Sequence, residues 1–260
     1  MSFLVNPYSY AGCDADALAF LAAAGITDAT ITSAICTLVS TMKSDGTWAK
    51  MSAIYPMVGG TATTHKFNLK NPADTNAAFR LSFVGGITHS ANGVAFNGTN
   101  SYANTFLAPS TGLTLNSHSF GIYSRTNSIN GNRIYGANNG VQVLQQNIVL
   151  PSLTQGAFGS GNSSFAYSIN TTSFFVATRT SNVDFKAFRA GVLLGSSAIS
   201  MTSLPNFNFY FGARNDSGTA AFFSNHQIAF AFLGSGLTDG EAAALYTSVQ
   251  AFQTTLSRQV

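Results

Sequence analysis

The sequence predicts a mainly β protein, built as an antiparallel two-sheet sandwich or jelly roll with a short helical region at the N-terminus and an amphipathic helix at the C-terminus. Three observations predict this class. From about residue 77, apolar and polar residues alternate with the period of a half-buried strand. Asn-Gly and Ala-Gly dipeptides divide the alternating runs at roughly hairpin spacing. Helical patterns stand only at the two ends, so no crossover helix is expected between parallel strands.

The composition narrows the choice of partners. Charged residues make up 8% of the 260 residues, and the net charge is +3. The basic residues form no run, which argues against a nucleic-acid partner. The N-terminus lacks the basic and apolar regions of a signal peptide, and no apolar run approaches the roughly 20 residues that span a bilayer. We therefore expect no membrane span and no export through a signal peptide.

Residues 1–60 form the predicted helical region. Asp14 can cap a first helix that ends at Gly25, and Thr27 or Asp28 can cap a second. The second helix has apolar residues at helical spacing, namely Ile31, Ile35, Leu38 and Met42. This region would pack on the larger part of the molecule or serve as an anchor for assembly with a partner.

The end of this region and its cysteines give two further expectations. Trp48, Met51 and Tyr55 suggest a short third helix that Pro56 stops. Cys13 and Cys36 both fall in the helical region; they could form a disulfide, but two buried free thiols are the favoured interpretation. Two cysteines leave the redox compartment undecided.

Residues 61–260 form the predicted sandwich, with about ten to twelve short strands. Alternating runs stand at 77–83, 94–96, 118–125, 174–179, 185–189, 206–214 and 226–233. In the last two runs the alternation predicts a core made of Phe207, Phe209, Phe211, Ile228, Phe230 and Phe232. Many short antiparallel strands bury one face each most economically in two packed sheets.

A helix over residues 238–258 closes the sandwich. Thr238 and Glu241 form a T-x-x-E capping box. The apolar residues that follow are spaced by four, three and four, as a stripe that packs on a sheet requires: Leu245, Val249, Phe252 and Leu256.

The sequence offers no catalytic constellation. A sandwich glycoside hydrolase needs two facing carboxylates, but Glu241 is the only glutamate and serves as a helix cap. Asp184 and Asp216 stand alone, so a glycan-degrading enzyme is the weakest hypothesis. The four histidines show no metal-ligand spacing. We therefore expect no enzyme activity, no metal and no cofactor.

One set of residues indicates a binding face. Tyr123, Arg125, Arg179, Tyr210 and Arg214 lie opposite the apolar positions of their strands. If these strands were neighbours, one sheet face would offer aromatic rings and guanidinium donors, which suit a sugar. The alternatives are a solvated outer face, a face covered by the N-terminal helices, and a protein interface.

Four segments resemble concanavalin A-like, laminin-G-type jelly rolls. The entry strand Val94–Ala103 resembles the family's F-D-G-x-x-D-Y strand, and Ser119–Arg125 resembles the strand after it. Arg189-Ala-Gly-Val192 stands at the family's N-G-x hairpin, and Gln227–Tyr246 resembles its closing strand and L-S/T-x-x-E-x-x-x-L-Y helix. The resemblance covers roughly residues 77–258 and implies the jelly-roll fold. The family's calcium-binding acids and the catalytic carboxylates of its glucanases have no counterparts, so neither is implied.

The N-terminal block resembles one that precedes this jelly roll in bacteriophage virion structural proteins. The segments concerned are Asp14–Leu21, Ala24–Thr27, Thr47–Ala62 and Thr64–Pro72. The resemblance implies a virion protein displayed at the particle surface, associated with other virion proteins through residues 1–60, oligomeric, and able to contact host glycans. The alternative hypothesis is a free-standing carbohydrate-binding module.

Overall fold

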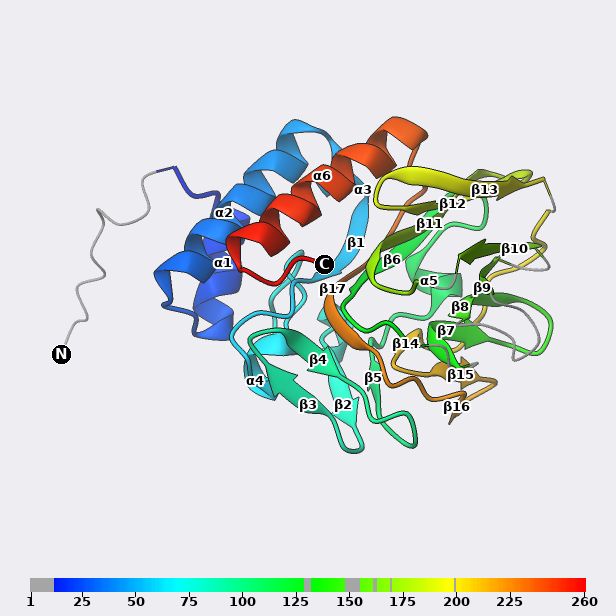
Figure 1. Cartoon of the computed structure of the whole chain (residues 1–260), viewed down its shortest axis with the longest axis horizontal. Coiled ribbons are helices and arrows are strands. Elements are labelled where there is room, and N and C mark those ends of the chain that lie inside the picture. The colour runs from blue at the N-terminus through cyan, green and yellow to red at the C-terminus, as the bar shows by residue number, and fades with distance from the viewer. Residues whose placement is uncertain (1–11, 129–131, 148–154, 161–162, 169, 199) are drawn as a thin grey trace.

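The structure is a computed structural model and describes residues 12–128, 132–147, 155–160, 163–168, 170–198 and 200–260. It is a sandwich of two β-sheets with a layer of helices on one side (Figure 1). The mainly β, jelly-roll-like architecture with helices at the N-terminal and C-terminal ends confirms the predicted fold class. Among the described residues, no helix has the length and apolar character needed to cross a membrane.

The sheet beneath the helices, here sheet I, has eight strands in the described part of the chain. Seven follow the order β13-β12-β11-β6-β17-β4-β3, and β1 also pairs with β17. All of its pairings are antiparallel. The strands are β1 (Met51–Tyr55), β3 (Thr88–Ser90), β4 (Gly93–Ala95), β6 (His118–Ser124), β11 (Ser173–Ser181), β12 (Asp184–Arg189), β13 (Val192–Ser197) and β17 (Gln227–Gly234).

The opposite sheet, here sheet II, has nine described strands, in the order β10-β9-β8-β7-β14-β5-β2 with the β15-β16 hairpin attached. It is mixed, because β15 runs parallel to β7. The strands are β2 (Ser82–Val84), β5 (Tyr102–Asn104), β7 (Arg133–Asn138), β8 (Val143–Asn147), β9 (Gln155–Ser160), β10 (Ser163–Ser168), β14 (Tyr210–Phe211), β15 (Arg214–Asp216) and β16 (Thr219–Ala221).

Two apolar layers hold the molecule together. The core between the sheets includes Phe120, Tyr135, Phe209 and Phe211. A second core joins sheet I to the helices and includes Phe230 and Phe232 of β17. The predicted core residues therefore divide between two layers, because a register shift between Ile228 and Phe230 turns the strand over. Phe207 is half-buried and belongs to neither core.

The helical layer follows the predicted caps. Helices α1 (Ala15–Ala24), α2 (Ala29–Ser44) and α6 (Asp239–Thr255) lie together over sheet I (Figure 1). Asp14 and Asp28 cap α1 and α2, and Thr238 with Glu241 forms the expected capping box of α6. The shorter helices are α3 (Thr47–Lys50), α4 (Ala62–His65), α5 (Pro109–Gly112) and the 3-10 helix η1 (Asn76–Ala78).

Three local predictions need correction. The expected third helix is only one turn, α3, and Met51–Tyr55 continues as β1, because that segment pairs along β17. The run 77–83 begins as η1, and Phe79 has a positive φ of 59° before β2 starts. The run 206–214 is not one continuous strand: it is strand at Tyr210–Phe211 and again from Arg214, since Gly212 turns the chain with a φ of 80°.

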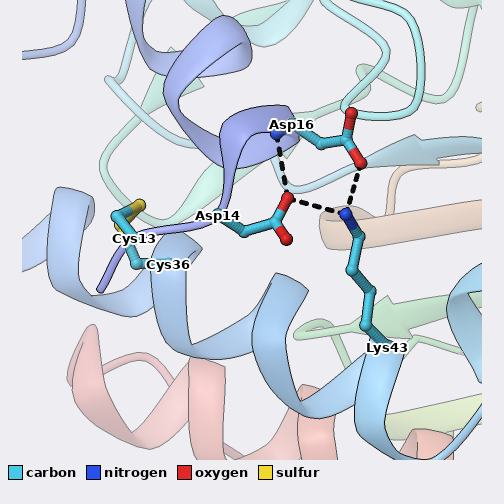
Figure 2. The surroundings of a disulfide bond; sticks show 5 residues. All are labelled: Cys13, Asp14, Asp16, Cys36 and Lys43. Atoms are coloured by element: carbon cyan, nitrogen blue, oxygen red, sulfur yellow. Dashed lines mark hydrogen bonds and ion pairs between the residues drawn. A yellow bond between two sulfur atoms is a disulfide. The ribbon is translucent and has the colours of Figure 1, made fainter.

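The N-terminal end of the described chain is attached to α2 by a disulfide bond and by ion pairs. Cys13 and Cys36 form a disulfide with a Cα–Cα distance of 5.1 Å, so the favoured expectation of free thiols is wrong (Figure 2). Cys13 lies just before α1 and Cys36 in the middle of α2, so the packing of these two helices brings the cysteines together, which sequence spacing alone did not reveal. Beside the disulfide, the Lys43 ammonium lies 2.7 Å from Asp14 and 2.6 Å from Asp16 (Figure 2). These bonds fix α1 against α2.

The C-terminal end is anchored by a buried arginine. The Arg258 side chain is 1% exposed. Its guanidinium donates to the backbone carbonyls of Pro56, Met57, Ala91 and Ala229 and to the Gln253 side chain. One side chain thus joins the end of α6 to the residues after β1, to the β3-β4 turn and to β17.

Candidate binding face on sheet II

The structure divides the five predicted binding residues between the two sheets. Tyr123 and Arg179 belong to sheet I, and Arg125 directly follows its strand β6. Tyr210 and Arg214 belong to sheet II. The expectation of one shared face is therefore wrong, because alternation along a strand does not reveal which sheet the strand joins.

Tyr123 lies under the helical layer. Its side chain is buried in the core between sheet I and the helices. Its hydroxyl donates to the Gln250 side-chain oxygen at 3.0 Å and accepts from the Val260 backbone N–H at 2.8 Å. Arg125 is half-buried nearby and donates to the Gln227 side chain at 3.3 Å. These two residues hold the C-terminal end and the start of β17, and Tyr123 has no exposed surface.

Arg179 is buried at the end of β11. It lies on the side of sheet I that faces the other sheet, with its guanidinium 5.4 Å from the Phe185 ring. It donates to the backbone carbonyl of Asn182 at 2.7 Å, which closes the β11-β12 hairpin. Burial lowers the pKa of this guanidinium. Arg179 therefore has a structural position.

Tyr210 lies on the outer face of sheet II, because its neighbours Phe209 and Phe211 point into the core. Its ring stacks on that of Tyr102 from the adjacent strand β5, with centroids 4.5 Å apart and planes 24° from parallel. Tyr102 is the more exposed of the two, and Tyr210 is 8% exposed. Burial, followed by the neighbouring Tyr102, raises the pKa of Tyr210. The pair forms a fixed aromatic surface.

Two arginines converge beside this pair. Arg133 donates through Nε, and Arg214 through Nη1, to the same Gln145 side-chain oxygen, at 3.1 and 2.9 Å. Their guanidinium carbons lie 4.9 and 4.5 Å from the ring centre of Phe222. A cation above an aromatic face is attracted by the ring quadrupole. Phe222 is itself 41% exposed.

Gly136 of β7 lies between the tyrosine pair and the residues that the arginines contact. Gly136 of β7 pairs in register with Tyr210 of β14 and with Gln145 of β8. A Cβ atom at position 136 would lie 3.3 Å from Cγ of Arg214 and 2.9 Å from Cβ of Gln145. The missing side chain lets Arg214 lie across the strand toward Gln145. We call the combined set the sheet II platform: Tyr102, Arg133, Gln145, Tyr210, Arg214 and Phe222.

One carboxylate lies at the edge of the platform. Asp216 forms an ion pair with Arg214 at 3.0 Å and accepts a hydrogen bond from the Asn138 side chain. Burial acts to raise the pKa of the Asp216 carboxyl, but the bonds from Asn138 and Arg214 hold it below its usual value. Burial and the charge of Arg214 lower the pKa of Arg133 to about 10.

The sequence missed four members of the platform. Arg133 reaches the outer face because a register shift lies between Arg133 and Tyr135, which leaves both Ile134 and Tyr135 in the core. Simple alternation assigns such residues to the wrong face. Phe222 lies after β16, and its φ of 57° is unusual for a bulky residue. Tyr102 was visible only as part of the Ser-Tyr-Ala segment, and Gln145 carried no signal.

The remaining polar groups offer less. His226 lies between Ser224 at 3.0 Å and Thr171 at 3.2 Å, but all three are fully buried, so no substrate could reach them. Within the described parts of the chain, no three His, Cys, Asp or Glu side chains gather as a metal site requires. A groove of about 590 Å³ runs along α2 and is lined mainly by small Ser, Thr and Ala side chains. Its lining includes the Cys13–Cys36 disulfide, and it lies in the helical layer over sheet I, not on sheet II (Figure 1).

Comparisons with known proteins support the fold. No protein-family model and no curated protein sequence matches the chain. Among solved structures, it is similar to a mutant Trypanosoma rangeli sialidase that displays trans-sialidase activity (15% identity, TM-score 0.55, 85% of this chain and 39% of that one). It is also similar to T. rangeli sialidase in complex with sialic acid (13% identity, TM-score 0.53, 82% and 38%).

A third similar structure is the binding domain of botulinum neurotoxin DC in complex with rat synaptotagmin II (11% identity, TM-score 0.52, 78% of this chain and 52% of that one). The chain thus spans about half or less of the length of each of these proteins. At these identities the likeness concerns the fold alone. The chain has the jelly-roll-like sandwich fold found in parts of these sialidase and toxin structures.

Proposed function

We propose that the chain is a carbohydrate-binding domain that holds a saccharide on the sheet II platform. The observation that carries this proposal is the placement of two stacked tyrosines, two arginines and an exposed phenylalanine on one sheet face. An aromatic ring packs against the apolar C–H face of a sugar, and guanidinium groups donate to its hydroxyls. The platform is held rigid by the sheet beneath it, so little ordering accompanies binding.

The proposed role is binding without turnover. Every carboxylate of the chain already serves as a cap, an ion-pair partner or a hydrogen-bond acceptor; the positions are Asp14, Asp16, Asp28, Asp45, Asp74, Asp184, Asp216, Asp239 and Glu241. Most glycoside hydrolases use a pair of carboxylates that flank the scissile bond, although sialidases use a tyrosine as the nucleophile. Asp216 has no acidic partner on the platform, which supports a binding role.

The similar structures support this proposal only through the fold. Two of them are T. rangeli sialidase structures, one of them in complex with sialic acid, and a sandwich of this kind forms part of each. A binding domain can be one part of a larger protein, and this chain matches less than half of each sialidase.

Display on a bacteriophage particle stays a prediction of the sequence resemblance. The three similar structures described above are two forms of a sialidase and a toxin domain, and none of these three is a virion protein. Virion partners, association through residues 1–60 and an oligomeric state are likewise predictions. A glycan-binding platform is compatible with that setting, because host attachment would use the same face.

A glycan array followed by calorimetry tests the proposal. We expect the intact chain to bind at least one class of glycan, and Tyr210→Ala and Arg214→Ala each to weaken binding at least about tenfold. Arg80→Ala is the matched control, because Arg80 also pairs with an aspartate, Asp74, at 2.8 Å but lies outside the platform. Thermal melts verify that each variant is folded. Binding to no glycan, or equal weakening by the control, would refute the proposal.

A further inference from the structure

The two arginines of the platform share an acceptor that carries no charge. Nε of Arg133 and Nη1 of Arg214 both point at the amide oxygen of Gln145, at 3.1 and 2.9 Å. A guanidinium forms its strongest hydrogen bonds with a carboxylate, often through two parallel N–H groups. The neutral amide oxygen of Gln145 thus lies at a position where the two guanidinium groups could instead hold a carboxylate oxygen.

The charges on the platform do not balance. Asp216 is the only acidic residue between Asp184 and Asp239 in the sequence. The latter two bond elsewhere, Asp184 to Thr180 and Asp239 to Lys186. Two cations therefore share one carboxylate: Asp216 forms its ion pair with Arg214, and its charge also acts on Arg133. Burial lowers the pKa of Arg133 most, the charge of Arg214 lowers it further, and the charge of Asp216 acts in the opposite direction.

The surroundings add an apolar contact to these two cations. The Phe222 ring lies against both guanidinium groups and keeps 41% of its surface exposed. The Nε atom of Arg214 is buried and has no hydrogen-bond partner. A ligand that combines a carboxylate with an apolar ring face could contact the guanidinium groups through the carboxylate and the Phe222 ring through its apolar face.

We propose that the sheet II platform selects saccharides that carry a carboxylate, and that this carboxylate binds between Arg133 and Arg214 in place of the Gln145 amide oxygen. The inference rests on the proposed glycan-binding function and names its ligand class. The sugar ring packs on Phe222 and the stacked tyrosines, and the negative charge neutralises the surplus cation. A neutral saccharide would keep only the stacking and hydroxyl contacts.

The decisive probe is a pair of ligands that differ only in charge. We would titrate the intact chain with an oligogalacturonate and with its methyl ester, in which the carboxylates are masked, at low and at physiological salt. The acid should bind at least about tenfold more tightly than the ester, and salt should weaken the acid more. Arg133→Gln and Arg214→Gln should reduce the preference for the acid, whereas Arg80→Gln should not.

One further variant separates charge recognition from loss of folding. In Gln145→Glu the protein supplies its own carboxylate to the two arginines, with almost no change of shape. We expect Gln145→Glu to keep or raise the melting temperature and to lose at least about tenfold in affinity for the acid. Equal binding of acid and ester would overturn this inference and leave the glycan-binding proposal in place. Failure of a glycan array and of both ligands would overturn both.

Discussion

Replacement of Arg258 by alanine should strongly destabilise the protein. The guanidinium donates to three buried backbone carbonyls, those of Pro56, Met57 and Ala229, as well as to Ala91 and Gln253. A buried carbonyl that loses its partner costs about 1 kcal/mol or more. Three such groups, together with lost packing on the Phe252 ring at 5.3 Å, give a loss of about 3 to 4 kcal/mol. That is a large fraction of the roughly 5 to 15 kcal/mol typical of a domain.

Urea unfolding followed by tyrosine and tryptophan fluorescence measures this loss. Arg80→Ala serves as the control, because its exposed ion pair with Asp74 should contribute less than about 1 kcal/mol. Arg258→Lys should fall between the two, since an ammonium has only three donors and cannot reach all the carbonyls. If Arg258→Ala destabilised the protein no more than Arg80→Ala, the interpretation of Arg258 as the C-terminal anchor would be refuted.

Two further predictions concern acid and reduction. Burial lowers the pKa of His65 to about 3 and of His118 and His226 to about 4. The folded protein therefore binds protons at these histidines less readily than the unfolded chain does, and it is most stable when all three are neutral. This stability is complete above the unfolded value of about 6.5 and is lost as pH falls toward the folded values, by up to about 1.4 kcal/mol per histidine per pH unit. Urea titrations between pH 7 and pH 5 should show it, and a flat profile would contradict the assigned neutral states. Reduction of the disulfide, or Cys13→Ser with Cys36→Ser, opens a 23-residue loop and should cost about 3 kcal/mol in the unfolding free energy; an unchanged midpoint with and without reductant would show that the bond adds no stability.

Much of the fold could be predicted from the sequence, because local chemistry specifies it. Thr238 and Glu241 marked the start of α6, and Asp28 marked that of α2, since a cap needs only residues close in the chain. Met51–Tyr55 was mistaken for helix because its strand conformation depends on β17, a strand far away in the sequence that pairs Met51 with Gly234 and Tyr55 with Ala231. The local sequence pattern therefore does not reveal which distant strand a segment will pair with.

The candidate site was predictable only in part for a related reason. Tyr210 and Arg214 were assigned to an outer face correctly, since the neighbouring phenylalanines of β14 face the core. Tyr123 was assigned to the same face because alternation gives the side of a strand and not its sheet. Arg133 was missed because one bulged residue, Ile134, reverses the pattern around it. The order of strands in the sheets decides which side chains meet, and it arises from long-range packing.

The most direct test of the glycan-binding account is to map the bound ligand. An isotope-labelled sample would be titrated with a glycan selected from the array, and amide and arginine Nε–H shifts would be followed by NMR. Binding on the sheet II platform should concentrate the shift changes on β5, β7, β14 and β15, including the Nε–H of Arg214. Changes confined to the helical layer over sheet I, with Tyr102, Tyr210 and Arg214 unaffected, would contradict it.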